Sequence, residues 1–533
     1  MMLLECGDAA IAIDCGLMFP GADLLGIDLV IPDISYLIEK KNHLKGIVLT
    51  HAHEDHVGAL PYFLNHLSVP LFGTRLTLGL IKNKLREHNL DDVADIREIT
   101  AGKPWEIAPF KLEGIRVTHS LMDCLALAIE TSVGIVIHTG DFKIDNTPME
   151  GEMFDFQRFA AYGEKGVLLL LSDSTNVERS GYTPSEREVG KNLEQIFQES
   201  VGKILVSTFS SSIPRIQQIV DISQACGRRV VLSGRSMIRN SQVASELGYL
   251  RLPGNFMTEN EHWRELPPEK LTFLTTGSQG EPLSVLHRVA LDDHKSIKIN
   301  PGDTVILSSK FIPGNEKTIS NLINHLYRRG AEVHYEKVSE IHVSGHASQE
   351  ELKTMLQLTR PRYFVPIHGE YRHLVRHRKL AQDVGVPKDD CFILEDGDVL
   401  ELTATSARKV QPVQVGKVFV DGKGVGDVGD VVLRDRRHLS EDGMVLAVMA
   451  IHQQSGEIVA GPDLVSRGFM RDEEGEEILE QARKVVLEVL ANMNRETRTD
   501  PAEIQEEVRN TLRRYFRKRL ERHPVVLPYI IET

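Results

Sequence analysis

The chain reads GIVLTHAHEDH from Gly46 to His56. Its apolar part, Ile47-Val48-Leu49, has the composition of a strand buried on both faces. Four side chains that bind divalent metals follow at once. Imidazole and carboxylate groups are ligands for Zn²⁺ and Mn²⁺. These four side chains are His51, His53, Asp55 and His56. Because alternate residues on a tight turn point to opposite sides, they can serve two ions.

Other short apolar runs along the chain also end in polar residues. Between them lie two segments whose apolar residues recur at helical spacing, Glu186–Phe197 and Ile213–Cys226. This alternation predicts an α/β fold with ligands bound outside the carboxyl ends of the strands. The predicted strands are 134–137, 167–171, 204–206, 230–232 and 363–367.

Two metal ions need more ligands than the first motif supplies. His119, Asp141 and His368 lie at or just beyond strand-like runs. A carboxylate such as Asp141 can bridge two cations. The implied chemistry is two-metal hydrolysis, in which a water between the ions is activated and charge on phosphoryl oxygens is offset.

The character of the chain changes near residue 410. The stretch Gln411–Asp435 is rich in Gly, Val and Asp, which predicts a linker or an irregular strand pair. Beyond it we expect two strands, two amphipathic helices and a final strand at Val525–Ile531. The second helix starts at Pro501, a favourable first helical position. These elements predict a small α+β domain.

Composition limits the class of protein. Of 533 residues, 62 are basic and 76 acidic, a net charge of −14, which argues against coating nucleic acid along the whole surface. A local basic channel is not excluded. The five cysteines include no C-x-x-C pair, and the N-terminus has acids where an export signal needs basic residues. We therefore expect a cytoplasmic protein with reduced thiols and no membrane span.

These motifs resemble those of the metallo-β-lactamase superfamily. Asp14 resembles its first aspartate, which supports the metal site. The segments Ser172–Asn176, Ser344–Ser348 and the one around His368 resemble motifs A, B and C of its β-CASP nucleic-acid branch. Longer strings, such as DCGLMFP from Asp14 and HTGDFKID from His138, resemble the bacterial ribonuclease J family over almost the whole chain.

The resemblance implies an α/β fold, a metallo-β-lactamase αββα sandwich with an inserted β-CASP α/β domain and a small C-terminal α+β domain. The expected boundaries are 1–185 and 340–410 for the sandwich, 186–339 for the β-CASP domain, 411–435 for the linker and 436–533 for the C-terminal domain.

The resemblance also implies roles for individual residues. One metal is expected on His51, His53 and His119, and the other on Asp55, His56 and His368, with Asp141 bridging. Two Zn²⁺ are expected, with Mn²⁺ or Mg²⁺ as alternatives. An additional divalent ion such as Ca²⁺ is expected near Leu25, Ile27 and Asp421.

Catalytic and substrate-binding roles follow the same resemblance. Asp55, Asp173 and His346 are expected to be catalytic. His346 would contact the scissile phosphate or assist proton transfer, and Asp173 would orient a neighbouring ligand or His346. The 5′-terminal nucleotide and its phosphate are expected on Ser210, Ser211, His342, Val343, Ser344, Gly345, His346 and Ser348.

The implied function is hydrolysis of single-stranded RNA. The resemblance predicts a 5′→3′ exonuclease that prefers 5′-monophosphate ends, with endonuclease activity, in mRNA decay and rRNA maturation. It also predicts a homodimer or homotetramer through the C-terminal domain, with a paralogue subunit as a further partner. The chain departs from the family pattern at Ser212 and Pro214, where asparagine and histidine are usual.

Three alternatives remain open on the sequence. A small-molecule metallohydrolase would use the same ligands, but the long stretch between Asp141 and His368 suits a clamp for a polymer. A DNA-processing enzyme is disfavoured by histidine at the motif C position, His368. A non-catalytic paralogue subunit is disfavoured by the complete ligand set.

Overall fold

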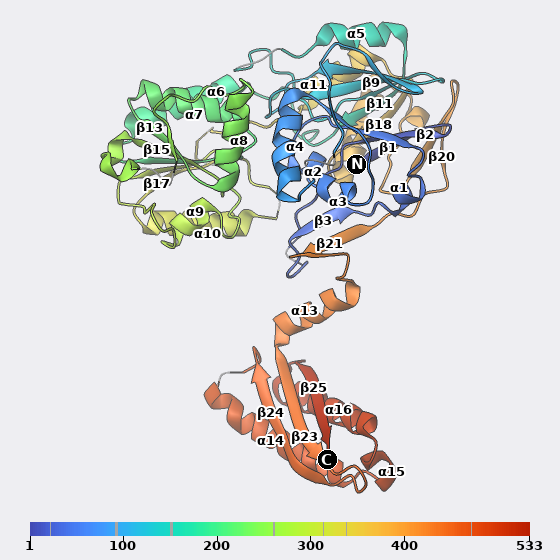
Figure 1. The fold of residues 1–533 in the computed structure, drawn as a ribbon, viewed down its shortest axis with the longest axis vertical. Helices are drawn as coiled ribbons and strands as arrows, with labels where there is room; N and C mark the ends of the chain where they lie inside the picture. Colours follow the sequence, from blue (N-terminus) through green and yellow to red (C-terminus); the bar gives the residue numbers. More distant parts are fainter. Residues whose placement is uncertain are drawn as a thin grey trace. The chain divides into compact units, whose positions relative to one another are not determined.

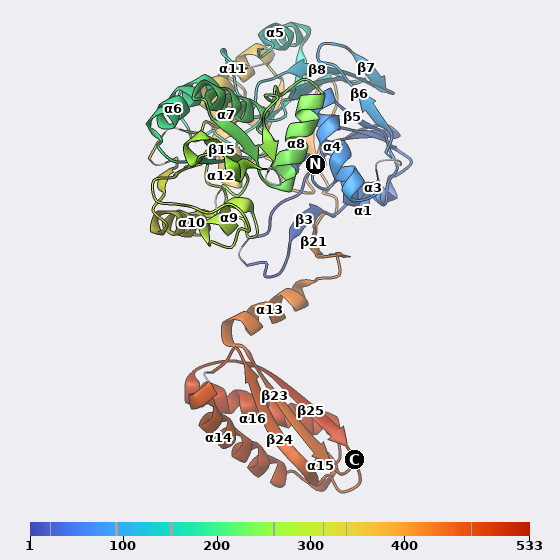
Figure 2. The same ribbon diagram turned by 60° about the vertical axis from the view of Figure 1, so that its left-hand side comes forward.

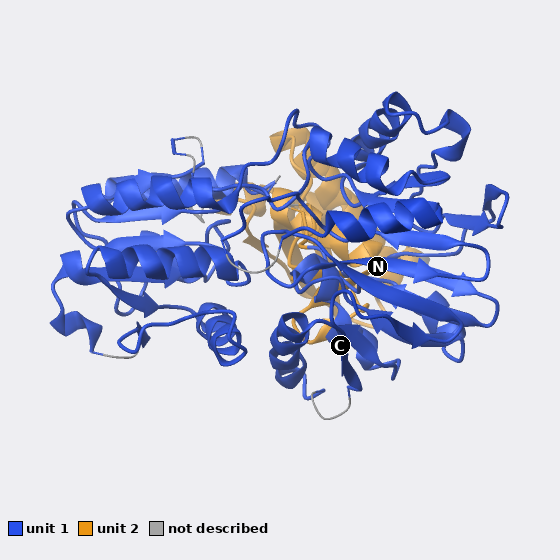
Figure 3. Ribbon diagram, turned by 90° about the horizontal axis from the view of Figure 1, so that it is seen from above, with its two compact units in different colours: residues 1–18, 31–417 blue, residues 19–30, 418–533 orange. Residues whose placement is uncertain are grey.

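The computed structural model describes residues 1–533 except 22, 91–93, 150–152, 259–261, 313, 337, 340 and 471, and omits the side chains of 472–474, 495 and 496. The chain forms two compact units (Figure 3). Unit 1 comprises residues 1–18 and 31–417, and unit 2 comprises 19–30 and 418–533.

Unit 1 contains two sheets that pack face to face. Between them lies a shared apolar core that includes Ile11, Ile13, Phe110 and Leu127. The first sheet consists of β1 (Met2–Cys6), β2 (Ala9–Ile13), β4 (Leu44–Val48), β5 (Leu71–Gly73) and β6 (Ile96–Glu98), in that order. The second has the order β18 (Tyr363–Ile367), β11 (Val167–Asp173), β10 (Ile135–His138), β9 (Leu125–Glu130), β8 (Phe110–Arg116) and β7 (Trp105–Ile107).

Helices cover this pair of sheets. α4 (Arg75–Glu87) contacts β5 and β6, and α11 (Gln349–Thr359) and α12 (Tyr371–Asp383) contact β11 and β18. The result is the predicted αββα sandwich. The remaining elements of this part are α1 (Ser35–Glu39), α2 (Glu54–Val57), α3 (Leu60–Leu64), α5 (Phe156–Lys165), η3 (Lys388–Asp390), β19 (Val399–Leu402) and β20 (Ala407–Val410).

The chain between β11 and β18 builds a second, parallel sheet domain in unit 1. Its helices α6 (Glu186–Glu199) and α7 (Ile213–Ala225) lie on one side and α10 (Glu316–Arg328) on the other (Figure 1). Its strands are apolar because both faces are buried. In sheet order they are β14 (Met257–Thr258), β13 (Arg229–Leu232), β15 (Leu271–Thr275), β12 (Ile204–Ser207), β16 (Thr304–Leu307) and β17 (Glu332–His334). The other helices are α8 (Arg235–Glu246), α9 (Val285–Ala290), η1 (Trp263–Glu265) and η2 (Pro268–Lys270).

Unit 2 ends in a three-stranded sheet of order β24 (Ile458–Arg467), β23 (Met444–Ile451) and β25 (Val525–Glu532). Two long helices, α14 (Asp472–Ala491) and α16 (Pro501–Leu520), pack on one face of it (Figure 2). These are the predicted elements of the α+β domain. Unit 2 also contains β22 (Gly424–Val425) and α15 (Arg495–Arg498), while β3 (Leu29–Pro32) and β21 (Lys417–Asp421) have residues in both units.

Helix α13 (Asp430–Asp442) differs from the prediction of a linker or irregular strand pair over Gln411–Asp435. The strand pair is present as β21 and β22. The helix went unrecognised because none of its residues is buried, so it carries no apolar stripe. No helix in the described part of the chain is long and apolar enough to cross a membrane.

Candidate metal centre

The first cluster of candidate ligands consists of three histidines with their ring nitrogens facing one another. His51 Nε2 lies 3.0 Å from His53 Nδ1, and His119 Nε2 lies 3.1 Å from the same atom. His51 and His53 follow β4, and His119 follows β8. The cluster therefore combines the turn after β4 of the first sheet with the segment after β8 of the second sheet.

Hydrogen bonds on the far side of two of these rings fix which nitrogen carries the proton. His119 Nδ1 donates to the Gly345 carbonyl at 2.7 Å. The Thr50 hydroxyl donates to the Asp14 carboxylate at 2.8 Å, so it can only accept from His51 Nδ1, 3.0 Å away. Both Nε2 atoms consequently present lone pairs toward His53. Three imidazole nitrogens that converge in this way fit a metal ion such as Zn²⁺.

The second cluster consists of Asp55, His56, Asp141 and His368. Asp141 Oδ2 lies 3.2 Å from His56 Nε2 and 3.7 Å from His368 Nε2. The same oxygen is 3.8 Å from His51 Nε2 in the first cluster. Asp55 Oδ2 lies 3.4 Å from His368 Nε2. Asp141 thus occupies the position between the two clusters that a bridging carboxylate requires.

The structure brings all the residues predicted as ligands of the two main ions into these adjoining clusters. Their action as ligands stays a prediction. His56 Nδ1 lies 2.8 Å from Asp14 Oδ2, so Asp14 also directs the His56 Nε2 atom toward Asp141. This is the supporting position expected of Asp14.

The backbone is strained at two residues of the site. Asp14 and His368 have φ of 57° and 55°, in the left-handed region that non-glycine residues rarely adopt. Such conformations concentrate at functional sites. Gly16 must remain glycine, because a Cβ there would lie 1.5 Å from the Asp55 carbonyl oxygen.

The two clusters differ in their electrostatics. Burial holds the pKa of His51 and of His119 well below the usual range, so these rings are neutral, the form that binds metal. Burial would also lower the pKa of His56, but Asp141 and Asp14 together raise it well above its usual value. The second cluster therefore pairs charged carboxylates with imidazoles that they hold in the protonated form, whereas the first is a set of neutral nitrogen donors.

Asp173 and His346, both predicted to be catalytic, form a direct pair. His346 Nδ1 lies 2.8 Å from Asp173 Oδ2. The Asp173 carboxylate is almost fully buried, and the His346 side chain is about one-fifth exposed. His346 Nδ1 also lies 3.9 Å from Asp141 Oδ2. The pair therefore lies beside the second cluster, and the other ring nitrogen of His346 takes no part in the bond to Asp173.

The residues predicted to bind substrate are spread over two loops. Ser210 and Ser211 lie on the turn between β12 and α7, where Asn240 Nδ2 donates to Ser210 Oγ at 3.0 Å. Gly345 and His346 lie on the loop before α11.

The remaining predicted substrate residues surround His346 on that same loop. Burial, together with Arg215 and Lys143, holds the pKa of His342 well below its usual range. The Ser344 hydroxyl accepts from the His346 amide at 3.2 Å, and Val343 is buried. A neutral His342 ring in positive surroundings suits an anionic phosphate.

Ser348 lies in a different setting from the other predicted substrate residues. Its side chain is buried and caps α11 in a reciprocal arrangement with Glu351. Its hydroxyl also lies 2.9 Å from Thr183 Oγ1. The hydroxyl is therefore engaged within the fold, and a contact between Ser348 and substrate stays a prediction.

The residues predicted for an additional divalent ion lie in unit 2. Arg436 Nη1 donates to the Leu25 carbonyl at 3.0 Å, and Arg436 Nη2 donates to the Asp421 carboxylate. Ile27 is buried in the same region. A guanidinium already bonds two of the expected oxygen ligands, so a divalent ion there would have to displace it. This additional site stays a prediction.

Four residues that support the site had been given no role from the sequence. Thr50 and Thr175 bond candidate ligands, and Asn176 Nδ2 and Thr183 Oγ1 donate to the His346 carbonyl at 3.0 and 2.8 Å. All are small polar residues beside motifs. Their only sequence signal is that proximity, because neither threonine nor asparagine is a distinctive residue type.

Gly345 gives a first test of this geometry. A Cβ at residue 345 would lie 2.6 Å from the His119 ring, so Gly345→Ala is expected to push His119 out of the first cluster. We expect Zn²⁺ affinity to fall about 10–100-fold, the range seen when groups that orient a ligand are lost. Chelator competition measures this, and unchanged affinity at both sites would show that His119 is not a ligand.

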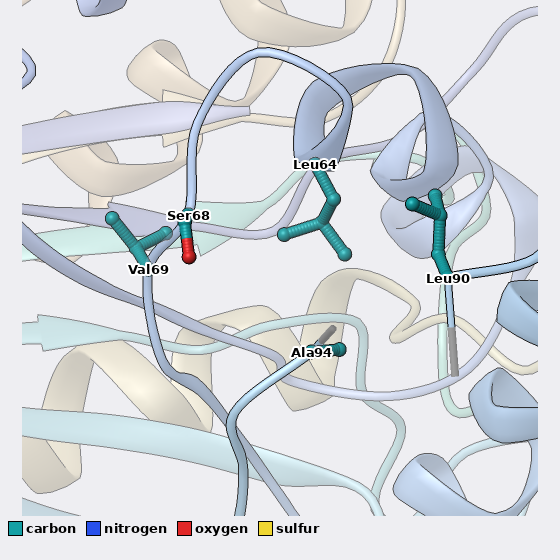
Figure 4. Close-up of a pocket in the computed structure, with 5 residues that line it drawn as sticks. All are labelled: Leu64, Ser68, Val69, Leu90 and Ala94. Atoms are coloured by element: carbon teal, nitrogen blue, oxygen red, sulfur yellow. The ribbon is translucent and has the colours of Figure 1, made fainter. Parts of the chain in front are cut away.

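We describe two cavities among the described residues of unit 1. The larger, about 250 Å³, is lined from both the sandwich and the inserted domain, and its walls include His119, Asp123, Pro214 and Tyr249. The departure from the family pattern at Pro214 therefore falls on the wall of a cavity that adjoins the first cluster. The other, about 10 Å³, has room for no more than one water. It is lined by Leu64, Ser68, Val69, Leu90 and Ala94 (Figure 4).

Comparison with known families accounts for nearly the whole chain. Residues 1–171 match the metallo-beta-lactamase superfamily, and residues 201–326 match the ribonuclease J beta-CASP domain. Residues 330–394 match the Zn-dependent metallo-hydrolase RNA specificity domain, and residues 431–533 match the ribonuclease J C-terminal domain. The predicted combination of a metallo-β-lactamase fold with β-CASP and C-terminal domains is confirmed.

Curated proteins similar to the chain span its whole length. Ribonuclease J of Thermus thermophilus is 42% identical over 98% of this chain and 91% of its own. Ribonuclease J of Helicobacter pylori is 39% identical over 99% of this chain and 77% of its own, and ribonuclease J2 of Bacillus subtilis is 37% identical over 100% and 96%. A solved protein of unknown function from Enterococcus faecalis shares the fold at 15% identity, with a TM-score of 0.50 over 78% of this chain and 96% of its own. The chain belongs to the ribonuclease J family and is a metal-dependent ribonuclease of the metallo-β-lactamase superfamily.

Proposed function

We propose that the chain hydrolyses RNA by a two-metal mechanism, as a 5′→3′ exonuclease that prefers 5′-monophosphate ends and also cleaves internally. We place its role in mRNA decay and rRNA maturation. The observation that carries the two-metal mechanism is the shared position of Asp141 between the clusters. Two Zn²⁺ suit the histidine-rich donor set, and Mn²⁺ or Mg²⁺ are the alternatives.

When bound, the ions would lower the pKa of a water and neutralise charge on the phosphoryl oxygens. Asp55, in the second cluster, is about half exposed, so a substrate can reach its carboxylate. Asp173 holds His346 by Nδ1, which leaves Nε2 free to bind the scissile phosphate or to transfer a proton to the leaving oxygen. The chain's own contribution is therefore to position a proton carrier beside the second cluster.

The inserted domain, residues 186–339, would act as the clamp for single-stranded RNA. Its Ser210–Ser211 turn precedes α7, and the His342–His346 loop precedes α11. We propose that these loops hold the terminal 5′-phosphate. A 5′-triphosphate adds charge and bulk where one phosphate fits, so it would be disfavoured.

The test compares otherwise identical RNA oligonucleotides with 5′-monophosphate and 5′-triphosphate ends. We expect exonucleolytic release of nucleotides from the monophosphate RNA to be faster by about tenfold or more, since a misfit of ~1.4 kcal/mol corresponds to a factor of ten. Internal cleavage should be less affected by the 5′ end. Equal rates of terminal release would refute the proposed end recognition, and no cleavage of either RNA by metal-loaded protein would refute the proposed function.

We also propose that the open face of the sheet in unit 2 joins two copies of the chain. The other face is covered by α14 and α16. The open face carries Leu446 between its cross-strand neighbours Val465 and Leu527, and next to them Val448 opposite Tyr529. Val465, Leu527 and Tyr529 are 43%, 44% and 61% exposed. Adjacent exposed apolar side chains of this kind favour a protein–protein contact.

Replacement of Leu527 and Tyr529 by glutamate should therefore produce a monomer. Charges buried in a symmetric apolar contact are strongly unfavourable. Light scattering coupled to size exclusion should give twice the chain mass or more for the wild type and the single-chain mass for the variant. A wild-type monomer, or a variant of unchanged mass, contradicts this assignment.

A further inference from the structure

A single hydroxyl group connects motif A to a candidate metal ligand. Thr175 Oγ1 lies 2.7 Å from Asp173 Oδ1 and 2.7 Å from His368 Nδ1. The Thr175 amide also donates to Asp173 Oδ1, at 2.9 Å. Asp173 thus binds Thr175 with one oxygen and His346 with the other.

The direction of these bonds follows from the chemistry of the groups. The Asp173 carboxylate accepts hydrogen bonds only, so the Thr175 hydroxyl gives its proton to Asp173. Its oxygen must then accept from His368 Nδ1. In the neutral, metal-binding form of the ring, this arrangement leaves the lone pair on His368 Nε2, which lies 3.4 Å from Asp55 Oδ2 and 3.7 Å from Asp141 Oδ2.

The same unit occurs at the other end of the site. There Asp14 binds His56 directly and holds His51 through the Thr50 hydroxyl. In both places one buried carboxylate orients two histidines, one by direct contact and one through a threonine. The repetition argues that the threonines do more than fill space, because a hydroxyl in this orientation selects one tautomer of the ring.

We propose that Thr175 is a positioning residue that holds His368 in the metal-binding tautomer and joins it to His346 through Asp173. Thr50 is the corresponding positioning residue for His51. This inference rests on the proposed function, because it assigns His368 to a metal site. As a consequence, the position of His346 relative to the second cluster is fixed.

The test adds Zn²⁺ alone to the metal-free full chain. It measures the affinity by chelator competition and counts the Zn²⁺ equivalents bound. Thr175→Val removes the hydroxyl and keeps the shape. We expect one of two Zn²⁺ equivalents to bind about 10–100-fold more weakly, as when an orienting group of a ligand is lost. Thr175→Ser keeps the hydroxyl and should restore both equivalents to within a few-fold of wild type.

Two further variants keep the test decisive. Thr175→Ala repeats the loss of the hydroxyl should the valine variant fail to fold, which thermal unfolding of the metal-free protein reports. Thr183→Val removes a different buried hydroxyl from the same region, one that bonds the His346 carbonyl and Ser348 but no candidate ligand. We expect it to keep both Zn²⁺ equivalents.

Three results would overturn the inference. They are wild-type Zn²⁺ binding in both Thr175→Val and Thr175→Ala, equal losses in Thr175→Ser and Thr175→Val, or an equal loss in Thr183→Val. Because no RNA is present, these results are separate from those that test RNA cleavage by the wild type. Failure of the positioning role is thereby distinguishable from failure of the proposed function.

Discussion

Asp141→Asn should abolish RNA cleavage while preserving the fold. The substitution keeps the shape of the side chain but removes the negative charge that faces His51, His56 and His368. Because Asp141 is placed to serve both clusters, the substitution should weaken or release a bound ion, which would otherwise stabilise the transition state by several kcal/mol. A loss of about 3–5 kcal/mol of that stabilisation corresponds to a loss of roughly 10²–10⁴-fold in rate.

The measurement pairs cleavage of a 5′-monophosphate RNA with the Zn²⁺ content of the protein. Asp141→Asn should lose at least one equivalent of metal. Asp303→Asn is the matched control, since Asp303 is also a buried carboxylate but pairs with Lys203 in the inserted domain. It should lower thermal stability and leave metal content intact. If Asp141→Asn keeps two equivalents and more than a tenth of the wild-type rate, Asp141 does not bridge the ions.

The strands of the site were predictable because a strand buried on both faces is a continuous run of apolar residues in the sequence. The run Val167–Leu171 reads as a strand, and the structure extends it as β11 to Asp173, which places the motif A acid at the strand end. Helix α13 has no such signal in the sequence, since it is exposed. The grouping of residues 19–30 with 418–533 also had no local signal, because it depends on contacts between distant parts of the chain.

The candidate ligands were predictable for a different reason. Three histidines in six residues are rare enough to be recognised, and His119, Asp141 and His368 follow strand-like runs. Their supports were not predictable. Thr175 and the Gly345 carbonyl each reach a candidate ligand by a single hydrogen bond, and such partners are set by the fold rather than by residue type. The Arg436 contacts with Leu25 and Asp421 likewise required coordinates.

His346→Asn should separate proton transfer from metal binding. The asparagine amide nitrogen can take the place of His346 Nδ1 and keep the bond to Asp173, while Nε2 is lost. Loss of a positioned acid or base lowers kcat by roughly 10²–10⁴-fold. Both Zn²⁺ equivalents should remain, because neither cluster of the proposed two-ion site depends on His346. Asp141→Asn should lose metal and activity together.

The discriminating measurement is therefore single-turnover cleavage by His346→Asn with the protein in increasing excess over the RNA, alongside its metal content. A rate that stays slow at saturating protein, with full metal content, assigns His346 to the chemical step. A slow rate that recovers fully at higher protein concentration would instead assign His346 to substrate binding. Loss of a Zn²⁺ equivalent would make His346 a ligand, consistent with its 3.9 Å distance from Asp141 Oδ2 but not with its bond to Asp173. Since Asp173 holds the ring by Nδ1 and the remaining nitrogen is the only one available for chemistry, the first of these outcomes is the one we expect.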